Sequence, residues 1–175
     1  MLTGESVARV GYLIALASAA GAVAMVAGGF HSDRQRERRW HVAVPALIMA
    51  LLVAVAGLHL HGWVAGGILL LSLPVYFAMQ APWVAIFAEL FRGEKSALAI
   101  ATINMLGIIG GFLGPYWMGW MREVTGGYAV GLGSLCVPWL IMAASIAWVT
   151  RPRIQKVTSA DEKMLNVAPE LVDES

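Results

Sequence analysis

Apolar residues form long uninterrupted stretches in this chain, and polar residues are confined to short segments between them. No Asp, Glu, Lys or Arg occurs between Arg39 and Glu89. A helix needs about 20 apolar residues to cross a bilayer, so this stretch is long enough for two crossings. Backbone groups find no hydrogen-bond partners in hydrocarbon, so each crossing must be a helix or a barrel strand. Barrel strands alternate apolar and polar residues, and the absence of alternation here predicts helices.

The pattern predicts five membrane-spanning helices, over about residues 10–30, 42–60, 64–88, 97–120 and 128–149. Residues 1–150 would then form one membrane-spanning domain. From Arg151 onward the chain becomes polar and acidic, which predicts a short cytoplasmic tail over residues 151–175 without stable structure. The expected fold is an all-α integral membrane bundle.

The composition supports a membrane protein and excludes several other classes. Hydrophobic residues make up 59% of the chain and charged residues 13%, whereas a soluble domain has about 25% charged residues. The net charge of +1 is too small for a protein that binds nucleic acid. The sequence has no Gly-rich phosphate loop followed by Lys and Ser or Thr, no catalytic constellation and no cluster of metal ligands. We therefore expect neither an enzyme nor a protein that holds a metal or another cofactor.

Basic residues between the spans predict the orientation in the membrane. Ten of the twelve Lys and Arg residues fall after the first span, after the third span and in the tail. Arg9 and Arg122 are the two on the opposite side. Short loops rich in Lys and Arg stay in the cytoplasm, so we expect an exterior N-terminus and a cytoplasmic C-terminus in the cell (inner) membrane. An odd number of spans with an exterior start and no signal peptide indicates that helices are missing in front.

Small residues recur on one face of two predicted helices. They are Ala17, Gly21, Ala24 and Gly28 in the first span, and Gly107, Gly110, Gly111 and Gly114, followed by Pro115, in the fourth. Small residues let helix backbones approach closely in lipid, so both faces are expected to contact other helices. In the third span, Pro74 and Pro82 each remove a backbone donor and are expected to bend the helix.

The segment after the first span resembles a loop of the major facilitator superfamily of transporters, G-x-x-x-D-R-x-x-R-R. It reads GGFHSDRQRERR from Gly28 to Arg39. The resemblance implies that Asp33 pairs with an Arg and locks a gate at the cytoplasmic end, with Arg34, Arg38 and Arg39 in the same gating loop. The alternative is a basic loop that only fixes the topology.

A second resemblance covers the fourth span. The run TINMLGIIGGFLGPYWMGW from Thr102 to Trp120, with the turn TGGY that begins at Thr125, is similar to helix eleven of the superfamily's anion:cation symporters. That group includes tartrate, phthalate and hydroxyphenylacetate permeases. The segment from Ser32 to His41 also resembles the group's S-D-R-x-x-E-R-R-x-H form. Over about residues 5–150, the resemblance implies that the five spans correspond to helices eight to twelve of a twelve-helix transporter.

The resemblance implies ion-coupled transport of a small organic anion, driven by H+ or Na+, by alternating access of two halves. In that group most charged substrate and coupling residues lie in the amino-terminal half, so we expect no transport by this chain alone. Its expected partners are the lipid bilayer and either the missing N-terminal helices or another membrane chain. The alternative is a stand-alone membrane scaffold or assembly partner that retains the half-fold. A membrane-bound enzyme is the weakest hypothesis, because the spans lack convergent acids, bases and metal ligands.

Few polar side chains lie within the spans, and the resemblance implies that Asn104, Gln80 and Trp83 bind substrate. An amide can hydrogen-bond a carboxylate without placing a full charge in the membrane. Alternatively, Asn104 and Gln80 join helices through hydrogen bonds, and Trp83 fills a packing gap. The position of Glu89, three residues before Arg92, favours an ion pair along the helix; a gate or proton-carrying carboxylate is the alternative.

Overall fold

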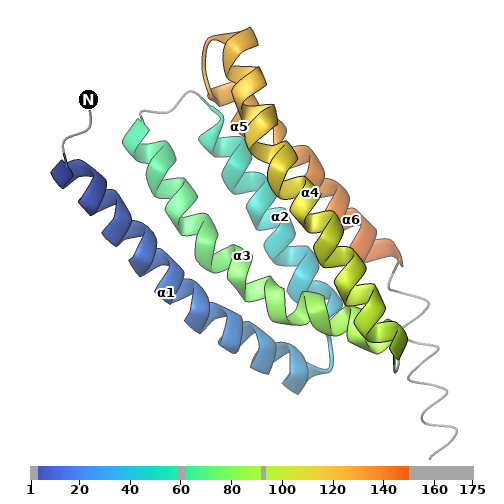
Figure 1. The fold of residues 1–175 in the computed structure, drawn as a ribbon. Helices are drawn as coiled ribbons and strands as arrows, with labels where there is room; N and C mark the ends of the chain where they lie inside the picture. The colour runs from blue at the N-terminus through green and yellow to red at the C-terminus, as the bar shows by residue number, and fades with distance from the viewer. Residues whose placement is uncertain (1–3, 59–61, 92–93, 150–175) are drawn as a thin grey trace, which may run out of the picture.

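The computed structural model describes residues 4–58, 62–91 and 94–149, and within these ranges the chain is helical without strands (Figure 1). The helices are α1 (Gly4–Gln35), α2 (Arg39–Ala56), α3 (Gly62–Leu90), α4 (Glu94–Thr125), α5 (Ala129–Ser134) and α6 (Cys136–Val149). The tail predicted over residues 151–175 lies outside the described residues.

Five segments are long and apolar enough to cross a membrane, as the sequence pattern predicted. They are Val7–Gln35, Arg39–Ala56, Trp63–Leu90, Ser96–Thr125 and Ala129–Trp148. Helices α1 and α4 continue beyond the apolar stretches, to Gln35 and Thr125, because polar side chains at a helix end do not interrupt the backbone hydrogen bonds. These extra turns carry charged residues beyond the apolar part of the bundle.

The fifth span consists of two helices rather than the single helix predicted for residues 128–149. Helix α5 ends at Ser134 and α6 begins at Cys136. Pro138 explains the break, because in a continuous helix its ring would clash with the carbonyl of Ser134 and its nitrogen has no hydrogen to donate. The Leu135 N–H instead donates to the carbonyl of Leu132 at 3.1 Å, which tightens the last turn of α5.

Helix α3 has a central place in the bundle, because it packs against both α1 and α2. Helix α2 in turn packs against α6, and consecutive long helices run antiparallel (Figure 1). Figure 1 also shows α3 bending in its second half, which contains the buried Pro82. The buried core is formed where α2, α3 and α6 meet, by Val42, Ala43, Ala46, Met79, Ile86, Ala143 and Ile146.

The two faces of small residues have different surroundings. The face of α1 packs on α3, as predicted: a Cβ on Gly28 would overlap the carbonyl oxygen of Ala78, and one on Gly21 would overlap the ring of Phe77. On α4, a Cβ added at Gly107, Gly110, Gly111 or Gly114 would meet nothing within 4 Å. Pro115 on the same helix is exposed. No helix of the described part of the chain therefore covers the small face of α4.

Candidate functional site

The turn between α1 and α2 is set by a backbone capping arrangement at the end of α1. The Glu37 N–H donates to the Ser32 carbonyl at 3.2 Å, and the Arg36 N–H donates to the Asp33 carbonyl at 3.2 Å. These two bonds form a Schellman motif, with Arg36 in the left-handed position at φ 51°. A non-glycine residue in this conformation costs roughly 1–2 kcal/mol. The chain therefore reverses within a few residues, and α2 begins at Arg39.

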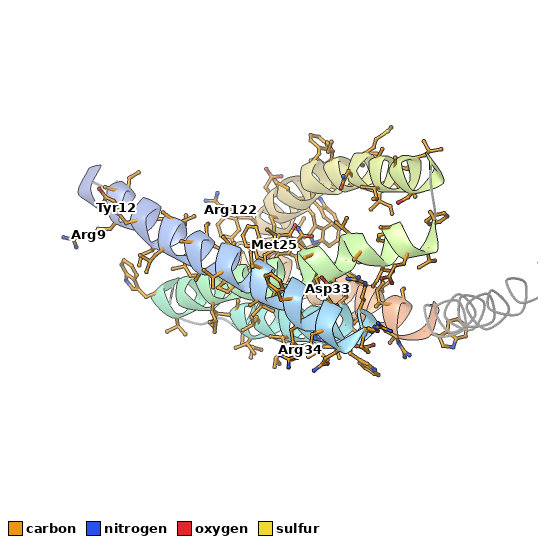
Figure 2. The ribbon with its side chains drawn as sticks, turned by 90° about the horizontal axis from the view of Figure 1, so that it is seen from below. Arg9, Tyr12, Met25, Asp33, Arg34 and Arg122 are labelled. Atoms are coloured by element: carbon orange, nitrogen blue, oxygen red, sulfur yellow. The ribbon has the colours of Figure 1, made fainter. Side chains whose placement is uncertain are left out.

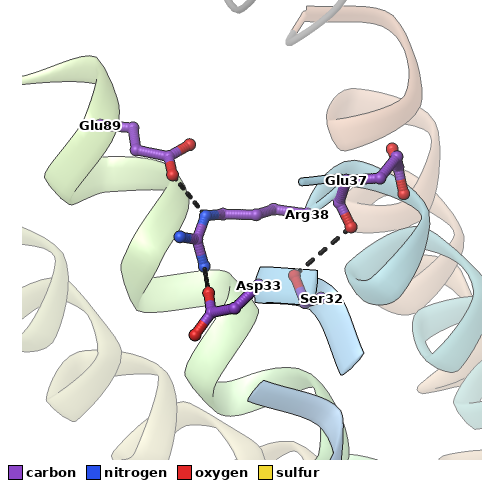
Figure 3. Close-up of polar contacts among 5 residues, drawn as sticks. All are labelled: Ser32, Asp33, Glu37, Arg38 and Glu89. Carbon is purple, nitrogen blue, oxygen red and sulfur yellow. Dashed lines mark hydrogen bonds and ion pairs between the residues drawn. The ribbon is translucent and has the colours of Figure 1, made fainter. Parts of the chain in front are cut away.

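This reversal places Arg38 between two carboxylates (Figure 3). Its Nη1 donates to Asp33 Oδ1 at 2.6 Å, and its Nε donates to Glu89 Oε1. Asp33 belongs to α1 and Glu89 to the last turn of α3, so the single guanidinium of Arg38 joins the ends of both helices. We call Asp33, Arg38 and Glu89 the ion-pair cluster.

The two carboxylates of the ion-pair cluster favour the charged form of Arg38. Burial by itself lowers the pKa of Arg38, but the hydrogen bond and the charge of Glu89, followed by those of Asp33, outweigh it. The pKa of Arg38 is therefore raised above its ordinary value. The side chains of Arg38, Asp33 and Glu89 are 23%, 60% and 44% exposed, so water screens the pairs. The ion-pair cluster thus forms a water-screened and readily separable link between α1 and α3.

Two neighbours of the ion-pair cluster stabilise the turn that presents it. Ser32 is fully buried, and its Oγ donates to the carbonyl of Glu37 at 3.3 Å. The carboxylate of Glu37 accepts the Trp40 N–H at 3.0 Å and so caps the start of α2. The same carboxylate lies 3.5 Å from Nδ1 of His41. The sequence pattern contains Ser32, Glu37 and His41 but does not indicate these roles.

The structure divides the predicted gating loop into two groups. Asp33 and Arg38 pair with each other, as the resemblance implied, and Glu89 joins them from α3. Arg34 is exposed, and Arg39 lies over the indole of Trp40 with its Cζ 5.0 Å from the ring centroid. Glu89 was expected to pair along its helix with Arg92, which lies outside the described residues; its partner here is Arg38.

Two of the three predicted substrate residues lie on α3, in different surroundings. Gln80 is half-buried and its Nε2 donates to the hydroxyl of Tyr76 at 2.7 Å. Tyr76 packs against the core and lies 6.3 Å from Trp139 of α6, measured between ring centroids. Trp83 also packs against the core and lies edge-on to Phe87 at 4.7 Å. Tyr76 was not predicted as a polar partner; its position one helical turn before Gln80 was the available signal.

Asn104, the third predicted substrate residue, is exposed on α4. It belongs to the same helix as the uncovered glycines. In the described part of the chain, no hydrogen bond or ring contact joins Asn104 to Gln80 or to Trp83. The described residues also contain no group of three His, Cys, Asp or Glu side chains that could hold a metal ion.

Comparisons with known proteins identify transporters as relatives. The chain is 35% identical over 137 residues to an Agrobacterium vitis protein named as a candidate tartrate transporter, covering 74% of this chain and 29% of that protein. It is 30% identical over 126 residues to the candidate metabolite transport protein NicT of Pseudomonas putida, covering 67% of this chain and 27% of NicT. It is 28% identical over 142 residues to an Acinetobacter baumannii protein named a quinolone resistance transporter, covering 78% of this chain and 32% of that protein.

These relatives confirm the predicted resemblance to transporters. The chain spans less than a third of the length of each of them. No family model matches the chain. No solved structure matches it either.

Proposed function

We propose that this chain forms part of a secondary transporter of the major facilitator superfamily, from its anion:cation symporter group. The transporter would move a small organic anion together with H+ or Na+ by alternating access. Three observations support the proposal: the five apolar helices, the similarity to named transporters, and the SDRQRERRWH and TINMLGIIGGFLGPYWMGW segments. The five spans would correspond to helices eight to twelve.

The ion-pair cluster is the structural observation that carries the gating part of the proposal. A transporter that alternates between two conformations needs contacts that hold one end closed and can be separated. Arg38 links α1 to α3 at one end of the bundle, and the partial exposure of its partners keeps the link weak enough to exchange. In this proposal the ion-pair cluster holds the cytoplasmic gate in one conformation, with the N-terminus of the chain outside the cell.

The substrate would be recognised by neutral amides within the spans. Gln80 already takes part in a polar pair with Tyr76 inside the membrane-spanning part of α3, where an unpaired polar group would be costly. Asn104 is on a helix face that a further helix or a substrate could approach. Trp83 packs against the core, on the same side of α3 as Gln80. It would fill space there rather than bind substrate through a free ring face.

A double-mutant cycle tests the ion-pair cluster. Arg38→Gln, Glu89→Gln and the double variant are expected to show a coupling energy of about 0.5–1 kcal/mol, because the pair is partly exposed and screened by water. The measurement is unfolding of the purified chain in detergent micelles. Arg34→Gln is the matched control: Arg34 is in the same turn, pairs with no carboxylate among the described residues and should not couple to Glu89→Gln. Equal coupling of Arg34 and Arg38 to Glu89 would contradict the cluster.

An uptake experiment tests the transport function. The purified chain in liposomes, under an inward H+ or Na+ gradient, is expected to take up tartrate- or phthalate-like acids no faster than empty liposomes. The reason is that a central site formed between two halves is incomplete with one half. Robust uptake by the chain alone would overturn the fragment hypothesis.

Supplying the other half distinguishes an incomplete transporter from a protein without transport function. Co-expression with the seven N-terminal helices of a relative, or with the product of an upstream reading frame, should restore gradient-driven uptake. Failure of the assembled complex to transport, with both parts folded, would argue against a transporter.

The second candidate function is a membrane scaffold or assembly partner. It is favoured by the face of α4, where no described residue lies within 4 Å of a Cβ added at any of four glycines. Such a face allows close contact with a helix of another chain. The DNA directly upstream discriminates between the two functions: a reading frame for seven apolar spans supports a truncated or split transporter, and its absence supports the scaffold.

A further inference from the structure

At the end of the bundle that carries the ion-pair cluster, positive charge exceeds what the described carboxylates neutralise. Arg38 forms ion pairs with both Asp33 and Glu89. Glu37 caps α2 and faces His41. Three further arginines in the same turn have no carboxylate within 4.0 Å in the described part of the chain: Arg34, Arg36 and Arg39. The turn therefore presents three guanidinium groups without a described counter-charge.

Arg39 is held in a geometry that suits an anionic ligand. Its guanidinium lies over the indole of Trp40, with Cζ 5.0 Å from the ring centroid. Its Nε is enclosed and has no hydrogen-bond partner within the described residues. Stacking uses the face of a guanidinium and leaves its edge available to an acceptor; because Nε is enclosed, the two Nη groups are the donors that a ligand from outside can reach. Planar N–H pairs of this kind match the oxygens of a phosphate.

The depth of Arg39 points to a lipid phosphate rather than a soluble ion. Helix α2 has 18 residues and begins at Arg39. At about 1.5 Å per residue it is about 27 Å long, close to the hydrocarbon thickness of about 30 Å. Arg39 and the 48% exposed Trp40 therefore lie at the edge of the hydrocarbon, where lipid phosphates begin. Figure 2 shows Asp33 and Arg34 at the opposite end of α1 from Arg9, so the turn with Arg34, Arg36 and Arg39 lies at one end of the bundle.

The geometry points to a binding site for the phosphate of an anionic phospholipid at this turn. Arg39 holds the headgroup phosphate through its guanidinium edge. Trp40 contacts the glycerol and upper acyl region. Arg34 and Arg36, both exposed, add long-range attraction for the negative headgroup. The site is separate from the ion-pair cluster, because Arg38 is already occupied by its two carboxylates. It also holds whether or not the chain is part of a transporter.

The test is lipid retention by the purified full chain, measured by native mass spectrometry in a non-ionic detergent. Phosphatidylglycerol is expected to bind more tightly than phosphatidylcholine. Arg39→Gln is expected to weaken the binding of phosphatidylglycerol about fivefold, since one basic residue near a membrane contributes about this factor. The binding of phosphatidylcholine should weaken less, because its choline group offsets the charge of the phosphate. Arg122→Gln is the matched control, because Arg122 lies over the ring of Tyr128 at the same 5.0 Å but belongs to the other end of the bundle. We expect it to change phosphatidylglycerol binding less than twofold.

Several outcomes would overturn the proposal. An unchanged phosphatidylglycerol affinity in Arg39→Gln, or equal losses in Arg39→Gln and Arg122→Gln, would show that no specific site exists. Displacement of phosphatidylglycerol by inorganic phosphate at millimolar concentration would assign the site to a soluble anion instead of a lipid. If Arg39→Gln does not fold, the double variant Arg34→Gln with Arg36→Gln serves in its place, since both side chains are exposed. A loss of phosphatidylglycerol affinity of about threefold or more in that variant supports the site, and an unchanged affinity overturns it.

Discussion

Replacing Gly28 with alanine is expected to destabilise the protein by about 1–3 kcal/mol and to loosen α1 from α3. A Cβ at this position would overlap the carbonyl oxygen of Ala78, a backbone atom in the middle of α3. The backbone of a helix cannot turn aside as a side chain can, so the two helices must separate. Gly28 also precedes Asp33 by little more than one helical turn, so the separation would draw Asp33 away from Arg38. The measurement is the thermal unfolding midpoint in detergent micelles.

Two other glycine-to-alanine substitutions serve as comparisons for the stability of Gly28→Ala. Gly110→Ala, also within a long helix, has nothing within 4 Å of the new Cβ and should be neutral or stabilising. Gly21→Ala would meet the ring of Phe77, a side chain that can rotate, so its effect should be intermediate. The expected order of stability is therefore Gly110→Ala, then Gly21→Ala, then Gly28→Ala. Equal midpoints for Gly28→Ala and Gly110→Ala would mean that α1 and α3 do not meet at Ala78.

Gly57→Ala is the second substitution for which we expect a large loss, again about 1–3 kcal/mol. Gly57 follows α2 at the end of the bundle opposite the ion-pair cluster. A Cβ there would lie 2.6 Å from the nitrogen of Gly133 and 2.8 Å from the carbonyl oxygen of Ala129, both backbone atoms of α5. Helix α5 would have to move off α2. Because α5 leads directly into α6, the contact of α6 with α2 would weaken as well.

Gly133→Ala is the matched control for Gly57→Ala, because it probes the same contact from the other side. A Cβ on Gly133 would have its nearest neighbour, the Cα of Gly57, at 3.9 Å, an ordinary van der Waals distance. The variant should therefore unfold at or above the midpoint of the unmodified chain. A larger loss in Gly133→Ala than in Gly57→Ala would contradict the packing of α2 on α5.

The glycine patterns show how far sequence reasoning reaches. The series ending at Gly28 in α1 and the series from Gly107 to Gly114 in α4 both predicted close helix contacts. Only the first has a helix against it in the described residues. The spacing of small residues indicates that a helix can be approached closely, but it carries no information about which helix does so.

The ion-pair cluster shows the same limit for charged residues. The loop pattern predicted that Asp33 pairs with an Arg, and the structure identifies Arg38 as that residue. Glu89 was expected to pair within its own helix with Arg92, which lies outside the described residues; in the structure it contacts Arg38 from the end of α3. Its partner depends on where the α3 end lies relative to the turn at Arg36. That position is set by the packing of α1 on α3, which no local pattern contains.

By itself, the sequence determined that the chain is a bundle of five membrane-spanning helices, and its motifs indicated a likeness to transporters. The reason is that burial in hydrocarbon and backbone satisfaction depend on the composition of each segment alone. The break at Leu135, the partners of Arg38 and the difference between the α1 and α4 faces were decided by the tertiary structure. Those features depend on which helices lie side by side, and that is the outcome of packing over the whole bundle.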